Sequence, residues 1–233
     1  MLNQNKSYTA IPNTAVTSGF FSKVYSWMTA GLALTALASV FTLSSESMLQ
    51  LIFGNKMVFY GLIIAELGLV VALSAAINKV SAITATLMFL GYSTLNGITF
   101  AAIFLVYTQS SIASTFFVAS GTFAAMSIYG FATKRDLTGW GSFLFMGLIG
   151  IIIASVVNIF LQSEMIYWVT SYIGVFVFVG LTAYDTQKIK MIGQAGFADE
   201  EHQKKAAILG ALRLYLDFIN LFLMLLRVMG NRR

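Results

Sequence analysis

The sequence has 233 residues, of which 58% are hydrophobic and 10% are charged, whereas a soluble protein has about 25% charged residues. It contains no cysteine and a lone histidine, His202, which excludes disulfides, zinc–thiolate sites and histidine metal clusters. Its net charge of +5 comes from basic residues scattered between apolar runs, not from the basic stripe of a nucleic-acid-binding protein, so the composition is that of a membrane protein.

The first 19 residues are polar and lack the apolar core and cleavage site of a signal peptide. They predict a short polar tail at residues 1–19, followed by a single membrane domain at residues 20–233. A spanning helix needs about 20 mostly apolar residues. Seven runs meet this length, at residues 24–42, 57–77, 82–107, 112–131, 143–161, 166–184 and 206–229.

The predicted fold class is an all-α integral membrane protein with seven transmembrane helices. Helices are expected because backbone amides in hydrocarbon must find hydrogen-bond partners within their own segment. The connectors are short, and only residues 134–136 and 187–205 have the composition of true loops.

The lysines and arginines of the connectors predict the orientation, because short cytoplasmic loops are enriched in them. With the N-terminus inside, the first three outer loops hold only Lys56, whereas the inner side holds Lys6, Lys23, Lys79, Lys134, Arg135, Lys188, Lys190, Lys204 and Lys205. We therefore expect a multi-pass protein of the inner (plasma) membrane with a cytoplasmic N-terminus. Seven spans would put Arg232 and Arg233 outside, against this rule, so the side of the C-terminus stays open.

Two aspartates lie in apolar sequence. Asp185 ends the sixth run in GLTAYDTQKIK, and Asp217 lies in the middle of the seventh, in ALRLYLDFINLFLMLL. An acid at the centre of a spanning helix costs about 2.5 to 3.5 kcal/mol on insertion scales, which marks both as candidate functional residues. Arg213, Asp217 and Asn220 stand at i, i+4 and i+7 and share one helix face. We expect this last helix at the centre of the bundle, where its polar stripe is shielded from lipid.

The two aspartates can meet if the sixth helix continues toward Lys190, with Lys188 and Lys190 reaching the membrane interface. Two such acids in a poorly solvated site would share a proton, and its loss as the pH rises would make them repel or recruit a cation. The pair would then act as a pH-sensitive latch. Calcium takes about six to eight oxygen ligands, so Asp185 and Asp217 would hold it only transiently, with water, Asn220 or backbone carbonyls completing the shell.

Structural roles remain open for each of these residues. Asp217 could form a salt bridge with Arg213 one turn away, and Asp185 could pair with Lys188 or Lys190. A third membrane acid, Glu66 in the second run, fits either a hydrogen bond to a neighbouring helix or a place in a pathway. No serine–base pair, nucleotide loop or metal-ligand spacing occurs, so no enzyme is expected, and paired-aspartate proteolysis is the remaining chemical alternative.

The two aspartate strings, with ATKRDLTGWGSFLFMGLIGIIIASVVNIF before them and RVMG after them, resemble the Bax inhibitor-1 family, also called the transmembrane BAX inhibitor motif family. The likeness runs from about residue 24 to the C-terminus and points to bacterial inner-membrane members. It implies seven helices with the last surrounded by the other six. It also implies a pH-sensitive calcium leak in which Asp185 and Asp217 form a dyad at a cytoplasmic-side gate and Glu66 lies along the pore.

In a bacterial relative, an arginine at the end of the second helix pairs with one dyad aspartate in the closed state; here that stretch reads AAINKVS. Lys79, which is offset, and Arg213 are the candidates for that pairing. The first hypothesis is therefore a calcium leak channel without a cofactor, with Asp185 and Asp217 as gate and pH sensor and with Glu66, Arg213, Asn220 and Lys79 in pathway or tuning roles. The alternative is a non-transporting regulator that binds another membrane protein, such as a membrane-anchored protease, through residues 1–19.

Overall fold

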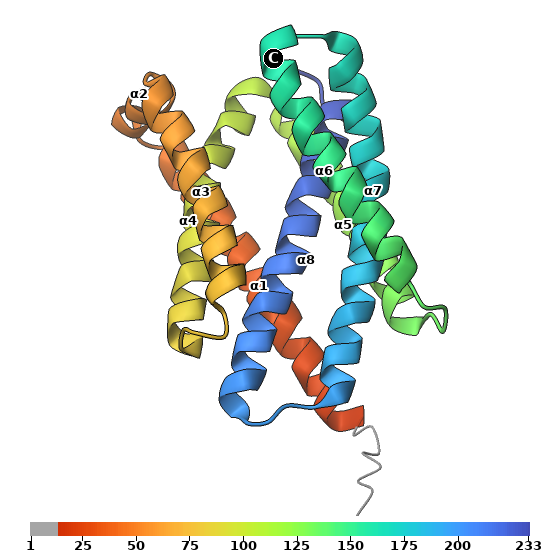
Figure 1. The fold of residues 1–233 in the computed structure, drawn as a ribbon. Coiled ribbons are helices and arrows are strands. Elements are labelled where there is room, and N and C mark those ends of the chain that lie inside the picture. Colours follow the sequence, from red (N-terminus) through yellow and green to blue (C-terminus); the bar gives the residue numbers. More distant parts are fainter. Residues whose placement is uncertain (1–13) are drawn as a thin grey trace, which may run out of the picture.

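Figure 1 shows the chain as a bundle of helices in the computed structural model, which describes residues 14–233, with side chains from residue 18 onward. Its elements are α1 (Thr14–Leu43), α2 (Glu46–Phe53), α3 (Lys56–Ala76), α4 (Ala82–Val106), α5 (Gln109–Ala132), α6 (Thr138–Leu161), α7 (Glu164–Ala195) and α8 (Glu200–Met229). All except α2 are long and apolar enough to cross a bilayer. The prediction of an all-α membrane protein with seven spans is confirmed.

Some helix ends differ from the prediction. The helix α1 begins at Thr14, so the end of the expected tail is helical, while residues 1–13 of that tail lie outside the described residues. The predicted loop at residues 187–205 is wrong for most of its length, because α7 continues to Ala195 and α8 begins at Glu200. Hydropathy marks where a chain leaves the hydrocarbon, whereas a helix continues until its backbone hydrogen bonds end.

Polar caps set where most of the helices begin. A backbone N–H of the first turn donates to the side chain of the cap residue at Ser45, Asn55, Ser81, Thr108, Ser163 and Asp199. The start of α6 is held differently. The N–H of Leu137 donates to Oε1 of Gln187 (2.9 Å), and Nε2 of Gln187 donates to the carbonyl of Arg135 (2.8 Å). The extension of α7 therefore fastens the α5–α6 connector.

The last helix, α8, lies at the centre of the bundle, between the α3–α4 pair and the α5–α7 group in Figure 1. It packs mainly against α1, α4, α5 and α7, while α3 packs on α4 and α6 packs on α7 from the outside. In its most apolar stretch 67% of α8 is buried inside the protein, against 6% of α3. The predicted central position of the last helix is confirmed, and the outer helices expose apolar side chains to the bilayer.

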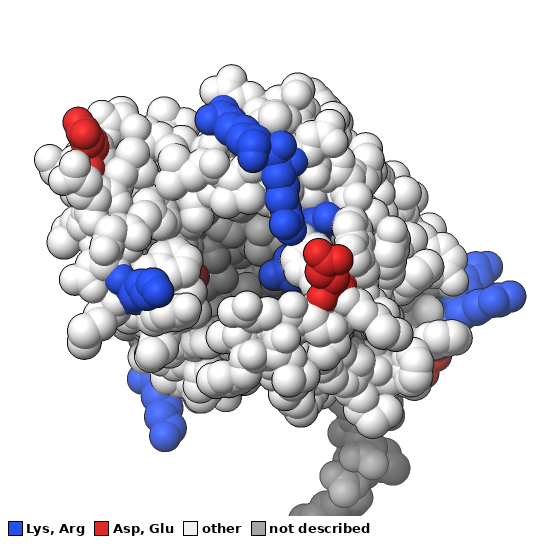
Figure 2. All heavy atoms as spheres, turned by 90° about the horizontal axis from the view of Figure 1, so that it is seen from above, with Lys and Arg blue, Asp and Glu red and all other residues white. Residues whose placement is uncertain are grey.

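The two ends of the bundle carry different connectors. At one end, which we call the C-terminal end, the α4–α5 and α6–α7 connectors lie near the C-terminus, and the α3–α4, α5–α6 and α7–α8 connectors lie at the opposite end (Figure 1). Figure 2 looks onto the C-terminal end and shows basic side chains gathered beside a hollow in this face.

A polar network joins α1, α4 and α8 in the core. The hydroxyls of Thr35 and Tyr215 lie 2.6 Å apart, and Thr35 also donates to the carbonyl of Ser93 (2.9 Å). Ser39, one turn further along α1, donates to the carbonyl of Gly97 (2.7 Å). Tyr215 is fully buried, so its hydroxyl depends on these partners for hydrogen bonding.

Tyr215→Phe is expected to lower the free energy of unfolding by about 1 kcal/mol, because the buried Thr35 hydroxyl loses a hydrogen-bond partner. Thermal unfolding of the purified protein in detergent measures the change. The matched control is Tyr60→Phe on α3, at a side chain that is 52% exposed. Equal unfolding midpoints for the two variants would show that the Tyr215 hydroxyl adds no stability.

Candidate functional site

Asp185 and Arg213 form an ion pair between α7 and α8. Nη1 of Arg213 lies 3.8 Å from Oδ1 of Asp185, and the two side chains are 33% and 15% exposed, respectively. The two helices run in opposite directions, so a residue toward the end of α7 faces one in the first half of α8. Because α7 continues to Ala195, Asp185 lies well inside the helix. This is the extension of the helix that the sequence analysis named as the condition for Asp185 to approach the last helix.

Asp217 lies one turn beyond Arg213 on α8. Its side chain is 4% exposed, and its Oδ2 receives no hydrogen bond from the described residues. The charges of Asp185 and Arg213 both act on it. The structure thus brings Asp185, Arg213 and Asp217 together, and we call them the Asp–Arg cluster.

The alternative pairings suggested by the sequence are not those in the structure. Arg213 pairs with Asp185 across the helices, and not with Asp217 on its own helix. On a helix, an acid that precedes a base by four residues is the more favourable pair, and Arg213 and Asp217 have the reverse order. Asp185, in turn, forms no salt bridge with either lysine named as its partner. Lys188 lies 5.5 Å from the ring centre of Tyr184, and Lys190 donates to the carbonyl of Phe131.

The Asp–Arg cluster can gain and lose a proton at Asp217. The pairing of Asp185 with Arg213 balances those two charges. An ionised carboxylate without a hydrogen-bond partner is costly to bury. Loss of that proton leaves a net negative charge in the centre of the bundle.

The cluster does not fit a resident calcium ion. Calcium takes about six to eight oxygen ligands, and the cluster supplies two carboxylates beside a guanidinium that repels cations. No three His, Asp or Glu side chains come together elsewhere in residues 18–233.

Glu66 lies apart from the Asp–Arg cluster, on α3. It accepts a hydrogen bond from Oγ1 of Thr99 on α4 (2.9 Å). A hydrogen bond to a neighbouring helix was one of the two roles that the sequence left open for this residue. Its charge also acts on Tyr92 of α4 and on Tyr215 of the core network. Glu66 is thus directed into the bundle from an otherwise lipid-facing helix.

The two other candidates occupy simpler positions. Nδ2 of Asn220 donates to the carbonyl of Leu216 on its own helix (2.8 Å). Lys79 is exposed in the α3–α4 turn, and no carboxylate of the described residues lies within 4.0 Å of it. Of the two candidate partners for the aspartate pair, the structure places Arg213 beside Asp185.

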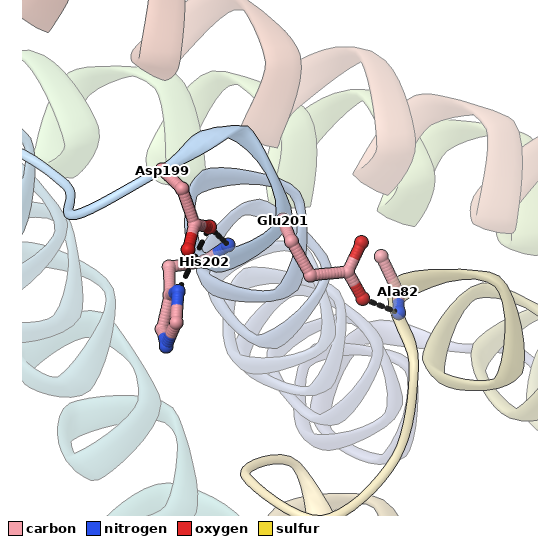
Figure 3. A network of polar contacts seen from close by, with 4 residues as sticks. All are labelled: Ala82, Asp199, Glu201 and His202. Carbon is pink, nitrogen blue, oxygen red and sulfur yellow. Dashed lines mark hydrogen bonds and ion pairs between the residues drawn. The ribbon is translucent and has the colours of Figure 1, made fainter.

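The start of α8 is tied to the start of α4 by contacts that the sequence reading missed (Figure 3). Oε1 of Glu201 accepts a hydrogen bond from the N–H of Ala82, and Asp199 caps α8 by accepting from the N–H of His202 (2.8 Å). The backbone N–H and the ring of His202 hold the pKa of Asp199 below its usual range. The stability that this carboxylate contributes is therefore present above its ordinary pKa and is lost as the pH falls through the lowered value.

Only one of these contacts could be predicted from the residues next to it in the sequence. An acidic residue before the run EEHQKKAAILG is typical of a helix N-cap, so Asp199 was open to prediction. The partners of Glu201 and Glu66 lie far away in sequence, where no spacing rule reaches them.

Comparison with known proteins agrees with this architecture. A family model described as "Inhibitor of apoptosis-promoting Bax1" matches residues 17–233. Inner membrane protein YbhL of Escherichia coli (strain K12) is 56% identical over 215 residues, which are 92% of each chain. An uncharacterized protein of Borreliella burgdorferi is 46% identical over 100% of this chain and 98% of its own, and one of Deinococcus radiodurans is 41% identical over 92% and 90%.

The family model covers all seven spans and both aspartates of the Asp–Arg cluster. The name of the Escherichia coli relative and the seven candidate spans support a multi-pass location in the inner membrane. Since the family model and relatives of this similarity extend over nearly the whole chain, the protein is a member of the Bax inhibitor-1 family.

Proposed function

We propose that this protein is a pH-sensitive, calcium-permeable leak channel in which Asp185 and Asp217 form the gate and the pH sensor. The observation that carries the proposal is the buried Asp217 carboxyl, whose Oδ2 has no hydrogen-bond partner among the described residues, beside the Asp185–Arg213 ion pair. A purely structural acid would be expected to have both of its oxygens satisfied. An acid left in this condition can serve as a switch.

In this proposal, the arrangement with Arg213 paired to Asp185 is the closed state. Arg213 joins α7 to α8 through Asp185, and its positive charge opposes the entry of a divalent cation. As the pH rises, Asp217 loses its proton and competes with Asp185 for Arg213. Two carboxylates then share one guanidinium, α7 and α8 are less firmly joined, and a calcium ion can replace the lost positive charge as it passes.

The remaining polar groups have a place in this proposal. Glu66 would attract cations from its position on α3, and Asn220 offers an amide one turn beyond Asp217. The connector lysines favour a cytoplasmic N-terminus, which would put the α7–α8 connector, and with it the nearer end of the Asp–Arg cluster, on the cytoplasmic side.

Calcium entry into liposomes that contain the purified protein and a trapped calcium indicator tests the proposal. Flux is expected to increase with pH. Asp217→Asn is expected to hold it at its low-pH level at every pH, whereas Asp185→Asn, which removes the ion pair between α7 and α8, is expected to raise the flux at low pH. If both variants retain the flux and the pH dependence of the natural protein, the aspartate mechanism is wrong. If the natural protein carries no calcium, the alternative of a non-transporting regulator of a membrane protein gains support, and deletion of residues 1–13 tests it.

A further inference from the structure

A second polar site lies at the C-terminal end of the bundle, away from the Asp–Arg cluster. A cavity of about 690 Å³ is formed where α6 ends, α7 begins and α8 passes into the C-terminal segment, and its walls include Asn158, Glu164, Tyr167, Trp168, Arg227 and Arg232. Arg227 is ten residues beyond Asp217 on α8, or about 15 Å along the helix. The cavity is therefore separate from the proposed gate.

Two guanidinium groups are held against one aromatic ring in this cavity. Cζ of Arg227 lies 5.6 Å from the ring centre of Tyr167, and Cζ of Arg232 lies 5.2 Å from the same centre. Nη2 of Arg232 also donates to the Tyr167 hydroxyl (2.7 Å). The same ring thus stabilises both positive charges.

The position of Arg232 is fixed by the backbone around it. The N–H of Asn231 donates to Oγ of Ser111 (2.9 Å), and the carbonyl of Asn231 accepts from the N–H of Thr108 (3.1 Å). The N–H of Arg233 donates to the carbonyl of Val106 (2.9 Å). The segment after α8 is therefore fastened to the α4–α5 connector, and the cavity is formed before any ligand arrives.

The two arginines lack an anionic partner. Of the carboxylates in residues 18–233, none lies within 4.0 Å of Arg227 or Arg232, although Glu164 lines the same cavity. Basic side chains gather beside the hollow of this face in Figure 2. The planar fork of a guanidinium matches the oxygens of a phosphate group, and it binds them through charge-assisted hydrogen bonds.

We propose that this cavity binds the phosphate group of a singly charged phosphodiester, as in the headgroup of an anionic phospholipid. Arg227 and Arg232 would bind the phosphate oxygens. The Glu164 carboxylate on the same cavity wall repels a second negative charge, which favours a phosphodiester over doubly charged free phosphate. Trp168 and Tyr167 are residue types that gather at the level of lipid headgroups. The connector lysines favour a cytoplasmic N-terminus, which would put Arg227 and Arg232 at the outer end of the bundle. A phosphate ligand there would explain why arginines occur at that end. The site does not depend on the proposed calcium permeation.

Native mass spectrometry of the full-length, delipidated protein tests this inference, with dihexanoylphosphatidylglycerol and inorganic phosphate as the two probes. The phosphatidylglycerol is expected to bind, and the double variant Arg227→Gln/Arg232→Gln is expected to weaken it by about tenfold or more, which corresponds to at least about 1.4 kcal/mol. The double lysine variant, which keeps both charges but loses the planar forks, should retain part of the affinity. Lys56→Gln, at an exposed lysine where α3 begins, is the matched control and should stay within twofold of the natural protein.

Two further variants guard against misfolding. Arg232→Gln alone changes a residue outside the helices. Tyr167→Phe keeps the ring but removes the hydroxyl that Arg232 contacts. Each variant should weaken binding of the lipid and leave the melting temperature of the protein unchanged. Binding of the lipid alone, lost in the same variants, supports the inference, whereas equal binding of inorganic phosphate overturns the preference for a singly charged phosphodiester. The inference is overturned if neither probe binds, or if the double glutamine variant binds both as well as Lys56→Gln does.

Discussion

Arg213→Gln is expected to move the pH dependence of calcium flux upward by about one pH unit, the shift that corresponds to about 1.4 kcal/mol of lost charge interaction. The guanidinium lies 3.8 Å from Asp185 and its charge also acts on Asp217, so it favours the ionised form of both acids. Without it they keep their protons to higher pH. Once both are ionised, the variant should conduct more than the natural protein, because no ion pair joins α7 to α8 and no cation opposes calcium.

Lys79→Gln is the matched control for Arg213→Gln. It removes one positive charge, at a residue that is exposed in the α3–α4 turn and has no carboxylate of residues 18–233 within 4.0 Å. Both the midpoint and the maximum of the flux should stay as they are in the natural protein. Arg213→Lys, which retains the charge, should keep the midpoint close to the natural value. A midpoint that moves with Lys79→Gln and stays fixed with Arg213→Gln would reverse the assignment of the two residues.

Gly130→Ala is expected to destabilise the protein by about 1 to 3 kcal/mol, the usual cost of overfilling a packed interface. A Cβ at Gly130 would overlap the backbone carbonyl of Ala183 on α7, and a backbone group cannot rotate out of the way. The two helices would have to separate, two residues before Asp185. Thermal unfolding in detergent measures the loss.

Gly121→Ala provides the control within the same helix. The space around Gly121 is open, so the added methyl group meets no neighbour, and alanine is a better helix former than glycine by up to about 1 kcal/mol. This variant should be as stable as the natural protein or slightly more so. If Gly130→Ala unfolds at the same temperature as Gly121→Ala, the close approach of α5 and α7 at Gly130 is not required for stability.

The sequence predicted much of the fold because each spanning helix is selected by its own residues. The number of spans follows from the apolar runs, and the central place of α8 follows from Arg213, Asp217 and Asn220 on one face. Helix ends were less well predicted. The extensions of α7 to Ala195 and of α8 back to Glu200 contain many polar and charged residues, so hydropathy assigns them to a loop.

The sequence predicted which residues belong to the candidate site, but not which of them pair with one another. Asp185 and Asp217 were found as acids in apolar sequence, and the structure places both beside Arg213. The partner of Arg213 was open, because spacing along one helix allows Asp217 as the partner, whereas the contact with Asp185 depends on how α7 and α8 pack together. No pattern in the sequence predicted the cavity around Tyr167, because Arg227 and Arg232 contact an aromatic residue that belongs to another helix.

The sequence by itself thus determined that this is a membrane protein with seven spanning helices, that a polar helix must be central, and which acids are costly enough to matter. These properties are sums over residues within one segment, because the free energy of inserting a helix into a bilayer depends on its own composition. Only the tertiary structure decided that Arg213 pairs with Asp185, that Glu66 binds Thr99, and that Arg227 and Arg232 share one ring. Such pairings depend on how the helices cross and how their side chains lean, and these are fixed by packing between segments far apart in the sequence.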